Sequence, residues 1–517
     1  MLTRRTILKI LALVPAVKAS KAFTEDRPAA SIHSGPFLPT RQSLAGYQIP
    51  QWFRDAKFGI WAHWGPQSAP EAGDWYARNM YIPGEWQYQH HLENYGHPSK
   101  VGFKDIVPTW KGDRFDPDYL VGLYKRAGAR YFVSMGVHHD NFDLWNSKHT
   151  RWNAVGMGPK RDIVGDFRRA ARKHGLRFGV SDHLWISYKW FAVSHLSDRE
   201  GPFAGVPYDG AAPEASDLYH LYSDPKLLTN KLDWNEDGIP EAWQQHWYDR
   251  IKDLVDQHQP DLLYSDGPLP FGEHGLRLLA HHYNLSAGRY GGATAVYTSK
   301  RPDDCATGTC VLDHERGVVD RIWLDPWQTD TCIGNWHYQR GIKYKTPKRI
   351  IDLLVDIVCR NGNLLLNFPL PNNGMLDKEE MDILEQISKW MNVNGQAIYA
   401  TRPWKIFGDG PALKAPSTEA SFNESKRTDL TADDVRFTVK NKTLYAFLMG
   451  WPAQERQAVI APLALGGRLG LGKIGKVELL GYSGSLEWEQ DGTSLRVSLP
   501  HEKPCDHAVV FKILGLA

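Results

Sequence analysis

The stretch DLLYSDG, residues 261–267, places a carboxylate directly after a short apolar run. Leu262 to Tyr264 predict a strand that is buried on both faces, and an unpaired charge inside such a strand would be costly. Asp266 is therefore expected at the end of this strand and not within it. The carboxyl end of a strand in a (β/α) barrel is where catalytic groups lie.

The same arrangement recurs along the chain. Each apolar run ends on polar or charged residues, and helical patterns at 162–174, 243–257 and 348–359 lie between the runs. Alternating strands and helices with continuous apolar strands predict a parallel sheet, and six or more such strands favour closure into a (β/α)8-like barrel. The runs other than 261–264 are 57–62, 129–137, 176–180, 295–299 and 363–366.

The pattern changes after about residue 400. Short strand-like runs are separated by turn residues with no helices between them, which predicts a small antiparallel β-sandwich. We therefore expect a catalytic barrel over residues 46–398 and a C-terminal β-sandwich over 399–517. The runs are 435–439, 443–448, 476–480, 486–488 and 508–512.

The N-terminus carries Arg4-Arg5 before a short apolar stretch and Ala-rich positions. This pattern predicts a twin-arginine-type signal peptide over residues 1–22, and hence a periplasmic or extracellular protein. A Sec-type signal and a retained anchor are the alternatives. Residues 23–45 are rich in Pro, Ser and Ala and predict a linker. No other segment is expected to insert into a membrane.

The chain has 517 residues and a formal net charge of +2, without a long run of one sign. Nothing in this balance indicates a nucleic-acid partner. The sequence contains no GxSxG elbow, no HExxH and no phosphate-binding Gly loop. Strand-end carboxylates together with many aromatic residues fit sugar hydrolysis best, in which one carboxylate attacks or positions water and another donates a proton. This chemistry requires no metal or cofactor.

Five motifs, in order, resemble glycoside hydrolase family 29, the retaining α-L-fucosidases. The resemblance covers roughly residues 45–515. The 138–155 motif, followed by GPKRDIVGDF, is the most specific of them. The motifs are KFGIWAHWG (57–65), GDWYARNMY (73–81), HHDNFDLWNSKHTRWNAV (138–155), DLLYSDG (261–267) and NGNLLLNFPLPNNG (361–374).

The resemblance implies a role for each matching residue. Asp266 would be the nucleophile that forms a covalent fucosyl-enzyme. Trp75 and Tyr264 would border the sugar, and Asp74, where many relatives have Glu, would accept from a hydroxyl. The fucose hydroxyls would be bound by His63, His138 and His139.

The acid/base follows less directly from the resemblance. Residues 311–317 end a strand with Glu315, which is our preferred acid/base. Many relatives have Trp-Glu-Thr further on, but this chain has Gln328, whose amide cannot act as an acid. Asp330 is the second candidate, or else a substrate-binding group. The two carboxyl groups of a retaining enzyme should lie about 5 Å apart.

Other positions depart from the family pattern. Many relatives carry a Tyr pair after the third strand, where this chain has His183 and Trp185, so either could replace the Tyr contact. Lys300 stands where relatives often have Arg and could bind a hydroxyl. Residues 233–244 resemble the first half of a calcium loop, but Gln244 occupies the position of the bidentate Glu; a helix start is the alternative.

The implied partner is a fucosylated glycan. An apolar wall near Trp61, Trp64 or Phe271 is expected to hold the methyl group of fucose. Two alternatives remain: an α-L-galactosidase or related hydrolase on the same fold, and an inactive fucose-binding protein. The sequence also leaves open whether Cys305 and Cys310 form a disulfide, because export permits one and their spacing would close a small loop.

Overall fold

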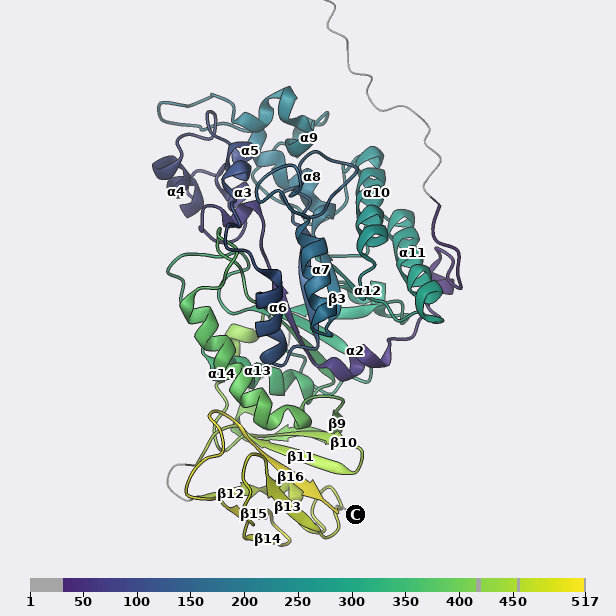
Figure 1. Ribbon diagram of the computed structural model, residues 1–517, viewed down its shortest axis with the longest axis vertical. Coiled ribbons are helices and arrows are strands. Elements are labelled where there is room, and N and C mark those ends of the chain that lie inside the picture. The colour runs from purple at the N-terminus through teal and green to yellow at the C-terminus, as the bar shows by residue number, and fades with distance from the viewer. Residues whose placement is uncertain (1–30, 415–419, 453–455, 516–517) are drawn as a thin grey trace, which may run out of the picture.

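The computed structural model describes residues 31–414, 420–452 and 456–515, so the predicted signal peptide lies outside the described residues. Within those three ranges, no helix combines the length and the apolarity that a membrane span needs. Two parts of the chain follow one another, a barrel ringed by helices and a smaller all-β part below it (Figure 1).

The first part is a closed barrel of eight parallel strands in sequence order, with β1 paired to β8. The predicted barrel is therefore confirmed. Its strands are β1 (Phe58–Ala62), β2 (Tyr131–Val137), β3 (Arg177–Asp182), β4 (Leu262–Ser265), β5 (Val296–Ser299), β6 (Val311–Glu315), β7 (Trp327–Cys332) and β8 (Gly362–Asn367).

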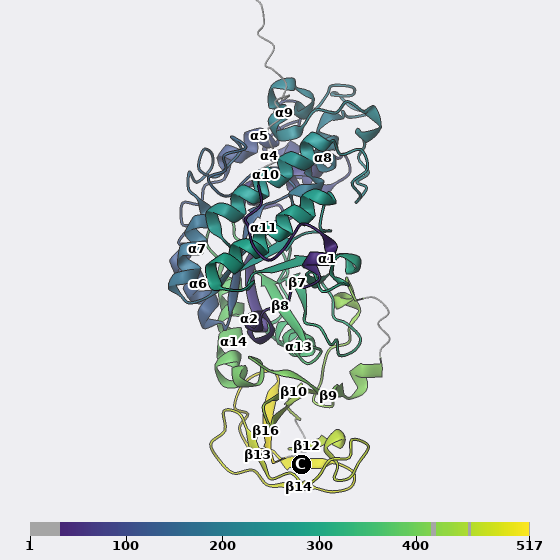
Figure 2. The same ribbon diagram turned by 90° about the vertical axis from the view of Figure 1, so that its right-hand side faces the viewer.

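Helices cover the outside of the barrel and its upper end (Figures 1 and 2). The three helical patterns of the sequence correspond to α7, α10 and α13. The α-helices are α1 (Arg41–Leu44), α2 (Gln51–Ala56), α3 (Tyr76–Asn79), α4 (Trp86–Asn94), α5 (Phe103–Ile106), α6 (Pro117–Arg126), α7 (Ile163–Lys173), α8 (Ser187–Trp190), α9 (Ser216–Tyr219), α10 (Glu241–His258), α11 (Glu273–Tyr290), α12 (Pro302–Cys305), α13 (Pro347–Val358) and α14 (Lys378–Asn394).

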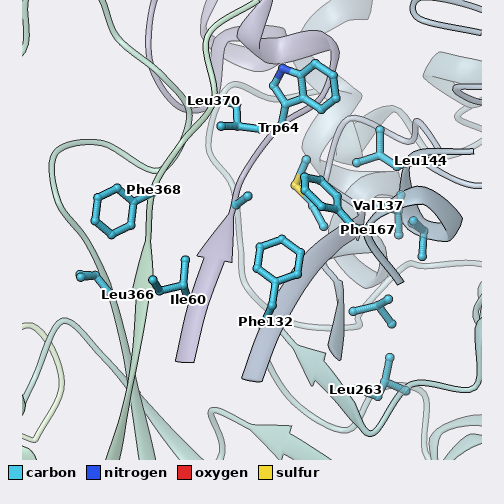
Figure 3. Packing of buried hydrophobic residues seen from close by; sticks show 14 of the residues in the cluster. Ile60, Trp64, Phe132, Val137, Leu144, Phe167, Leu263, Leu366, Phe368 and Leu370 are labelled. Atoms are coloured by element: carbon cyan, nitrogen blue, oxygen red, sulfur yellow. The ribbon is translucent and has the colours of Figure 1, made fainter. Parts of the chain in front are cut away.

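Each barrel strand separates two apolar clusters, which explains its continuous apolar sequence. Ile60 and Phe132 point outward to pack among the helices (Figure 3). Their chain neighbours Trp61 and Tyr131 point inward and fill the barrel axis. Successive side chains of a strand alternate between its faces, so every second residue belongs to the same cluster. This alternation fixes which strand-end residues face the barrel mouth.

The second part consists of two antiparallel sheets, which confirms the predicted β-sandwich. One sheet has the order β13-β16-β11-β10-β9 and the other β12-β15-β14. This second part has a core of Val, Leu, Ile and Phe that is separate from the core of the barrel. The strands are β9 (Arg402–Asp409), β10 (Val435–Lys440), β11 (Thr443–Leu448), β12 (Gln457–Ile460), β13 (Lys476–Leu479), β14 (Trp488–Gln490), β15 (Leu495–Ser498) and β16 (Val509–Leu514).

The predicted linker differs from the structure over its described part. Residues 31–45 lie against α11: the Phe37 amide donates to Asn284 Oδ1 over 2.9 Å, and Phe37 is buried. The Asn284 amide donates in return to the carbonyls of His33 and Phe37. Composition alone does not show such packing, because one buried aromatic and one amide suffice to hold the segment.

Candidate active site

A cavity of about 680 Å³ opens at the carboxyl ends of the barrel strands. Eleven of the residues that the sequence singles out as catalytic or substrate-binding line this one cavity. They are His63, Asp74, Trp75, His138, His139, His183, Tyr264, Asp266, Lys300, Glu315 and Asp330.

Strand alternation explains how residues far apart in the sequence meet there. Leu262 and Tyr264 belong to the inner cluster of the barrel, so Asp266, two residues on, continues the inward row. Steps of two residues along the strand lead in the same way from Trp61 to His63, and from Val311 through Asp313 to Glu315. The last inward side chain of each strand therefore lies at the mouth.

Asp266 is surrounded by imidazoles. Its Oδ2 lies 3.1 Å from His183 Nδ1 and 3.3 Å from His139 Nε2. Burial alone would raise the pKa of Asp266, but the neighbouring imidazoles and the Lys300 ammonium hold that pKa well below its usual range. The carboxylate is thus ionised and, with a side chain 20% exposed, accessible from the cavity.

The backbone of Asp266 is held by Trp185, whose Nε1 donates to the Asp266 carbonyl over 2.7 Å. Gly267 follows with φ of +139°, and a Cβ there would lie 2.5 Å from Trp185 Nε1. Trp185 does not line the cavity, whereas His183 does. Of the two residues that could replace the Tyr pair, His183 therefore faces the sugar site and Trp185 supports it from behind.

Lys300 lies at the centre of a group of carboxylates. Its Nζ donates to Asp313 Oδ1 and Asp330 Oδ1, both over 3.0 Å. The same nitrogen is 4.0 Å from Asp266 Oδ1 and 3.7 Å from Glu315 Oε2. Burial alone would lower the pKa of Lys300, but the carboxylates raise it well above its ordinary value. One buried cation therefore links the two candidate catalytic carboxyl groups.

Glu315 differs electrostatically from Asp266. Burial raises the pKa of Glu315 to about 7, against the opposing effect of Lys300, and the charge of Asp330 adds to the rise. Its Oε1 accepts from Trp336 Nε1 over 3.2 Å, and its side chain is 20% exposed. A carboxyl group with this pKa holds a proton near neutrality and can donate it.

Asp330 has no free oxygen toward the cavity. Its Oδ2 accepts from the Tyr264 hydroxyl over 2.8 Å, and both oxygens accept from Lys300. Its side chain is only 1% exposed, compared with 20% for Glu315. Asp330 is paired with Glu315 across β6 and β7. The arrangement favours a supporting role for Asp330 over proton donation.

Two histidines of the cavity, His63 and His138, are anchored by neutral amide groups. His63 Nδ1 lies 3.1 Å from Asn367 Oδ1, and His138 Nδ1 lies 2.9 Å from Gln67 Nε2. Burial, together with repulsion between the neighbouring imidazoles, lowers the pKa of both histidines well below the usual value. A neutral imidazole can donate to one sugar hydroxyl or accept from another, depending on its tautomer.

Asp74 is oriented by a residue that the sequence reading missed. His337 Nδ1 lies 2.6 Å from Asp74 Oδ1, and His138 Nε2 lies 3.9 Å from the same oxygen. His337 is fully buried in the loop after β7. β7 itself has the polar sequence WQTDTC, so it and the loop behind it lacked the apolar signal that marked the other strands.

Five further lining residues were also missed: Asn79, Trp234, Arg316, Trp336 and Phe422. Trp234 lies within the stretch that resembled a calcium loop. Among the described residues, no group of possible metal ligands falls in 233–244, and Glu236 Oε1 instead accepts from the Phe271 amide over 2.7 Å. The stretch thus brings an aromatic ring to the cavity, with Trp75 5.7 Å away between ring centroids.

Of the three residues expected to form an apolar wall, Trp61 lines the cavity whereas Trp64 and Phe271 do not. Trp64 packs against Trp110 and Phe115 on the outer face of the barrel. Strand alternation is again the reason, since Trp61 is inward and Trp64 lies one residue out of phase with it. Phe271 packs on Trp247 of α10.

Three groups of residues in the cavity or directly behind it have ligand atoms within 4.8 Å of one another and could geometrically hold a cation. All of them use the histidines, Asp74 or Asp266 described above. The cavity thus has an ionised carboxylate, Asp266, and a protonated carboxyl group, Glu315, on either side of Lys300. Its polar groups suit ligands that are rich in hydroxyl groups.

Comparison with known proteins decides the family. The α-L-fucosidase model matches residues 27–396, and the α-L-fucosidase C-terminal domain model matches residues 427–514. The chain belongs to the α-L-fucosidase family. It is a glycoside hydrolase, and the resemblance to family 29 is thereby confirmed.

Relatives of known function span nearly the whole chain. Human plasma α-L-fucosidase is 29% identical, with 91% of this chain and 90% of that protein covered. Mouse tissue α-L-fucosidase is 28% identical, with 90% of this chain and 91% of that protein covered. A crystal structure of Thermotoga maritima α-fucosidase in complex with fucose has a TM-score of 0.69 at 23% identity, covering 92% of this α-L-fucosidase and 100% of that chain.

Proposed function

We propose that this α-L-fucosidase hydrolyses terminal α-L-fucosides with retention of configuration, with Asp266 as nucleophile and Glu315 as acid/base. The observation that carries the proposal is the pair of opposite pKa shifts beside one ammonium: low for Asp266 and about 7 for Glu315. Two carboxyl groups whose environments separate their pKa values can divide the roles of nucleophile and acid between them.

In the first step, Asp266 Oδ attacks the anomeric carbon while the bond to the glycosidic oxygen breaks. Glu315 gives its proton to that oxygen, so the leaving sugar departs neutral. In the second step, Glu315, now ionised, takes a proton from water, whose oxygen displaces Asp266. Two inversions at the anomeric carbon give net retention.

The other residues bind and orient. His63, His138 and His139 are placed for the fucose hydroxyls, and Asp74 accepts from one more. Lys300 keeps Asp266 ionised and holds Asp330, which in turn fixes the Tyr264 hydroxyl. Trp61 offers an apolar surface for the C6 methyl group. No step requires a metal or a cofactor.

Fucose as the recognised sugar is supported by the relatives. The T. maritima structure is described as a complex with fucose, and a related one as a fucosynthase in complex with α-L-Fuc-(1-2)-β-L-Fuc-N3. Comparing 4-nitrophenyl α-L-fucoside with the L-galactoside tests this choice. Faster cleavage of the galactoside would favour the α-L-galactosidase, and binding of fucose without turnover would favour the inactive protein.

The decisive test uses azide with two variants. Glu315→Ala should lose activity on natural fucosides, and azide should restore turnover of 4-nitrophenyl α-L-fucoside with α-L-fucosyl azide as product. Asp266→Gly should give the β-azide instead, because azide then attacks the substrate directly. If Glu315→Ala keeps near-normal activity on fucosylated oligosaccharides, the acid/base assignment is wrong and Asp330 becomes the candidate.

We further propose export by the twin-arginine route. Arg4-Arg5 and the apolar stretch after them carry this proposal. The disulfide between Cys305 and Cys310 supports export by either route, since disulfides persist mainly in oxidising compartments.

A further inference from the structure

A loop of the C-terminal sheet reaches the barrel mouth beside Glu315. The loop joins β9 to β10, and its described part from residue 420 runs along the ends of β6 and β7. The Phe422 amide donates to the Glu315 carbonyl over 2.7 Å, and the Glu424 amide donates to the Arg316 carbonyl over 3.0 Å. Two backbone hydrogen bonds thus fix this loop against the residue proposed as acid/base.

Side chains hold the loop in place as well. The Glu424 carboxylate accepts from the Thr331 hydroxyl over 2.6 Å and pairs with Lys345 at 2.8 Å. The Ala420 carbonyl lies so close to Gly317 that a Cβ there would be 1.8 Å from it. The position of residues 420–424 is therefore determined by several independent contacts.

Packing does not explain the conformation and the exposure of Phe422 in this loop. Its side chain is 58% exposed and lines the cavity, although the backbone has φ of +53°. A bulky residue in that region of φ is strained, and an exposed ring gains little burial in return. Asn423 and Glu424 beside it are buried. The conformation presents an aromatic ring to the cavity at a cost in stability.

We propose that Phe422 forms the binding surface for the leaving-group sugar, and that this C-terminal loop completes the site that selects the glycan. The inference rests on the proposed function: the acid must reach the glycosidic oxygen, so the sugar that leaves lies on the Glu315 side of the cavity. Phe422 borders that side. Its ring offers an apolar face, which suits the C–H face of a pyranose.

Residues 194–217, a long loop that could equally be expected to set this preference, do not line the cavity. Tyr208 and Asp209 of that loop are buried, and the Asp209 carboxylate accepts from the Tyr81 hydroxyl and from Lys104 of α5. Specificity for the leaving group is therefore assigned to a segment that follows the barrel in the chain.

Two substrates separate the leaving-group site from the fucose site. α-L-Fucosyl fluoride has no leaving sugar, whereas an α-L-fucosyl-disaccharide has one. Phe422→Asn removes the ring and keeps a residue that tolerates positive φ. We expect kcat/KM for the best disaccharide of a linkage panel to fall about tenfold, with kcat/KM for the fluoride changed less than twofold. Phe422→Tyr should restore the disaccharide rate.

Tyr482→Asn is the matched control, because Tyr482 is an exposed aromatic residue in the turn after β13 and outside the cavity. An equal loss on both substrates, or unchanged rates on both, would overturn the assignment. Failure of the proposed function would look different: the unaltered enzyme would cleave neither the fluoride nor any disaccharide of the panel.

Discussion

The Tyr264 hydroxyl donates to Asp330 Oδ2 over 2.8 Å, and lies 3.4 Å from Asp266 Oδ1. Tyr264 thus connects the proposed nucleophile to a carboxylate that sits beside the proposed acid. Asp330 raises the pKa of Glu315 because its negative charge disfavours a second one nearby. The two proposed catalytic groups therefore belong to one electrostatic unit, and changes to its members should alter the pH dependence in defined directions.

Asp330→Asn removes the charge that helps to keep Glu315 protonated. The pKa of Glu315 should fall, so kcat/KM should decline at lower pH than in the unaltered enzyme. We expect a loss of about 10- to 100-fold at neutral pH, measured as a pH profile with a fucosyl-disaccharide. Added azide should not restore activity. Strong rescue by azide, with a new α-azide product, would instead identify Asp330 as the acid/base.

Lys300→Met should move the profile the other way. The Lys300 cation lowers the pKa of both Glu315 and Asp266. In the unaltered enzyme, kcat/KM should fall as pH rises through about 7, where Glu315 loses its proton. Without the cation, the acidic limb of the pH profile, set by Asp266, and the basic limb, set by Glu315, should both lie at higher pH. Lys300→Arg, which keeps the charge, should leave them nearly in place; a Met variant with an unshifted profile would contradict the role given to Lys300.

Gly267→Ala tests the support behind the nucleophile. The added Cβ would displace the Trp185 ring and so disturb the hydrogen bond to the Asp266 carbonyl. We expect kcat to fall about 10- to 100-fold. Gly272→Ala is the control, because Gly272 also has a positive φ, +51°, but nothing lies within 4 Å of its Cβ. Both variants should lose about 1–3 kcal/mol of stability from backbone strain, measured by chemical denaturation. Equal kcat values for the two variants would show that the hydrogen bond from Trp185 does not support the nucleophile.

Replacing Arg4 and Arg5 together by Lys tests the route of export. Twin-arginine translocation depends on this pair, so α-L-fucosidase activity in the periplasmic fraction of a bacterial host should drop at least tenfold while the cytoplasmic fraction gains it. Thiol labelling of the exported protein should show Cys305 and Cys310 oxidised. Undiminished periplasmic activity would point to a Sec-type signal.

Much of the site could be predicted from local sequence. Asp266, His63 and Lys300 each follow an apolar strand, and strand alternation places such residues inward at the mouth whatever the rest of the fold does. The opposite pKa shifts of Asp266 and Glu315 could not be predicted in this way. The raised pKa of Glu315 comes from burial and from the charges of Asp330 on β7 and Asp266 after β4, against the opposing charge of Lys300 after β5, and only the closed barrel brings these groups together.

The (β/α) barrel, the C-terminal β-sandwich and the family could all be predicted from the amino-acid sequence, because these depend on periodicities and motifs within short segments. β7 and the loop after it were not predicted, since WQTDTC is polar and its burial depends on Tyr131 across the barrel and on Asp313 of the adjacent strand β6. The folded structure was needed to show that Trp64 faces away from the cavity while Trp234 and Phe422 face it. A side chain's direction in a loop is fixed by long-range contacts, and those have no signature in the local sequence.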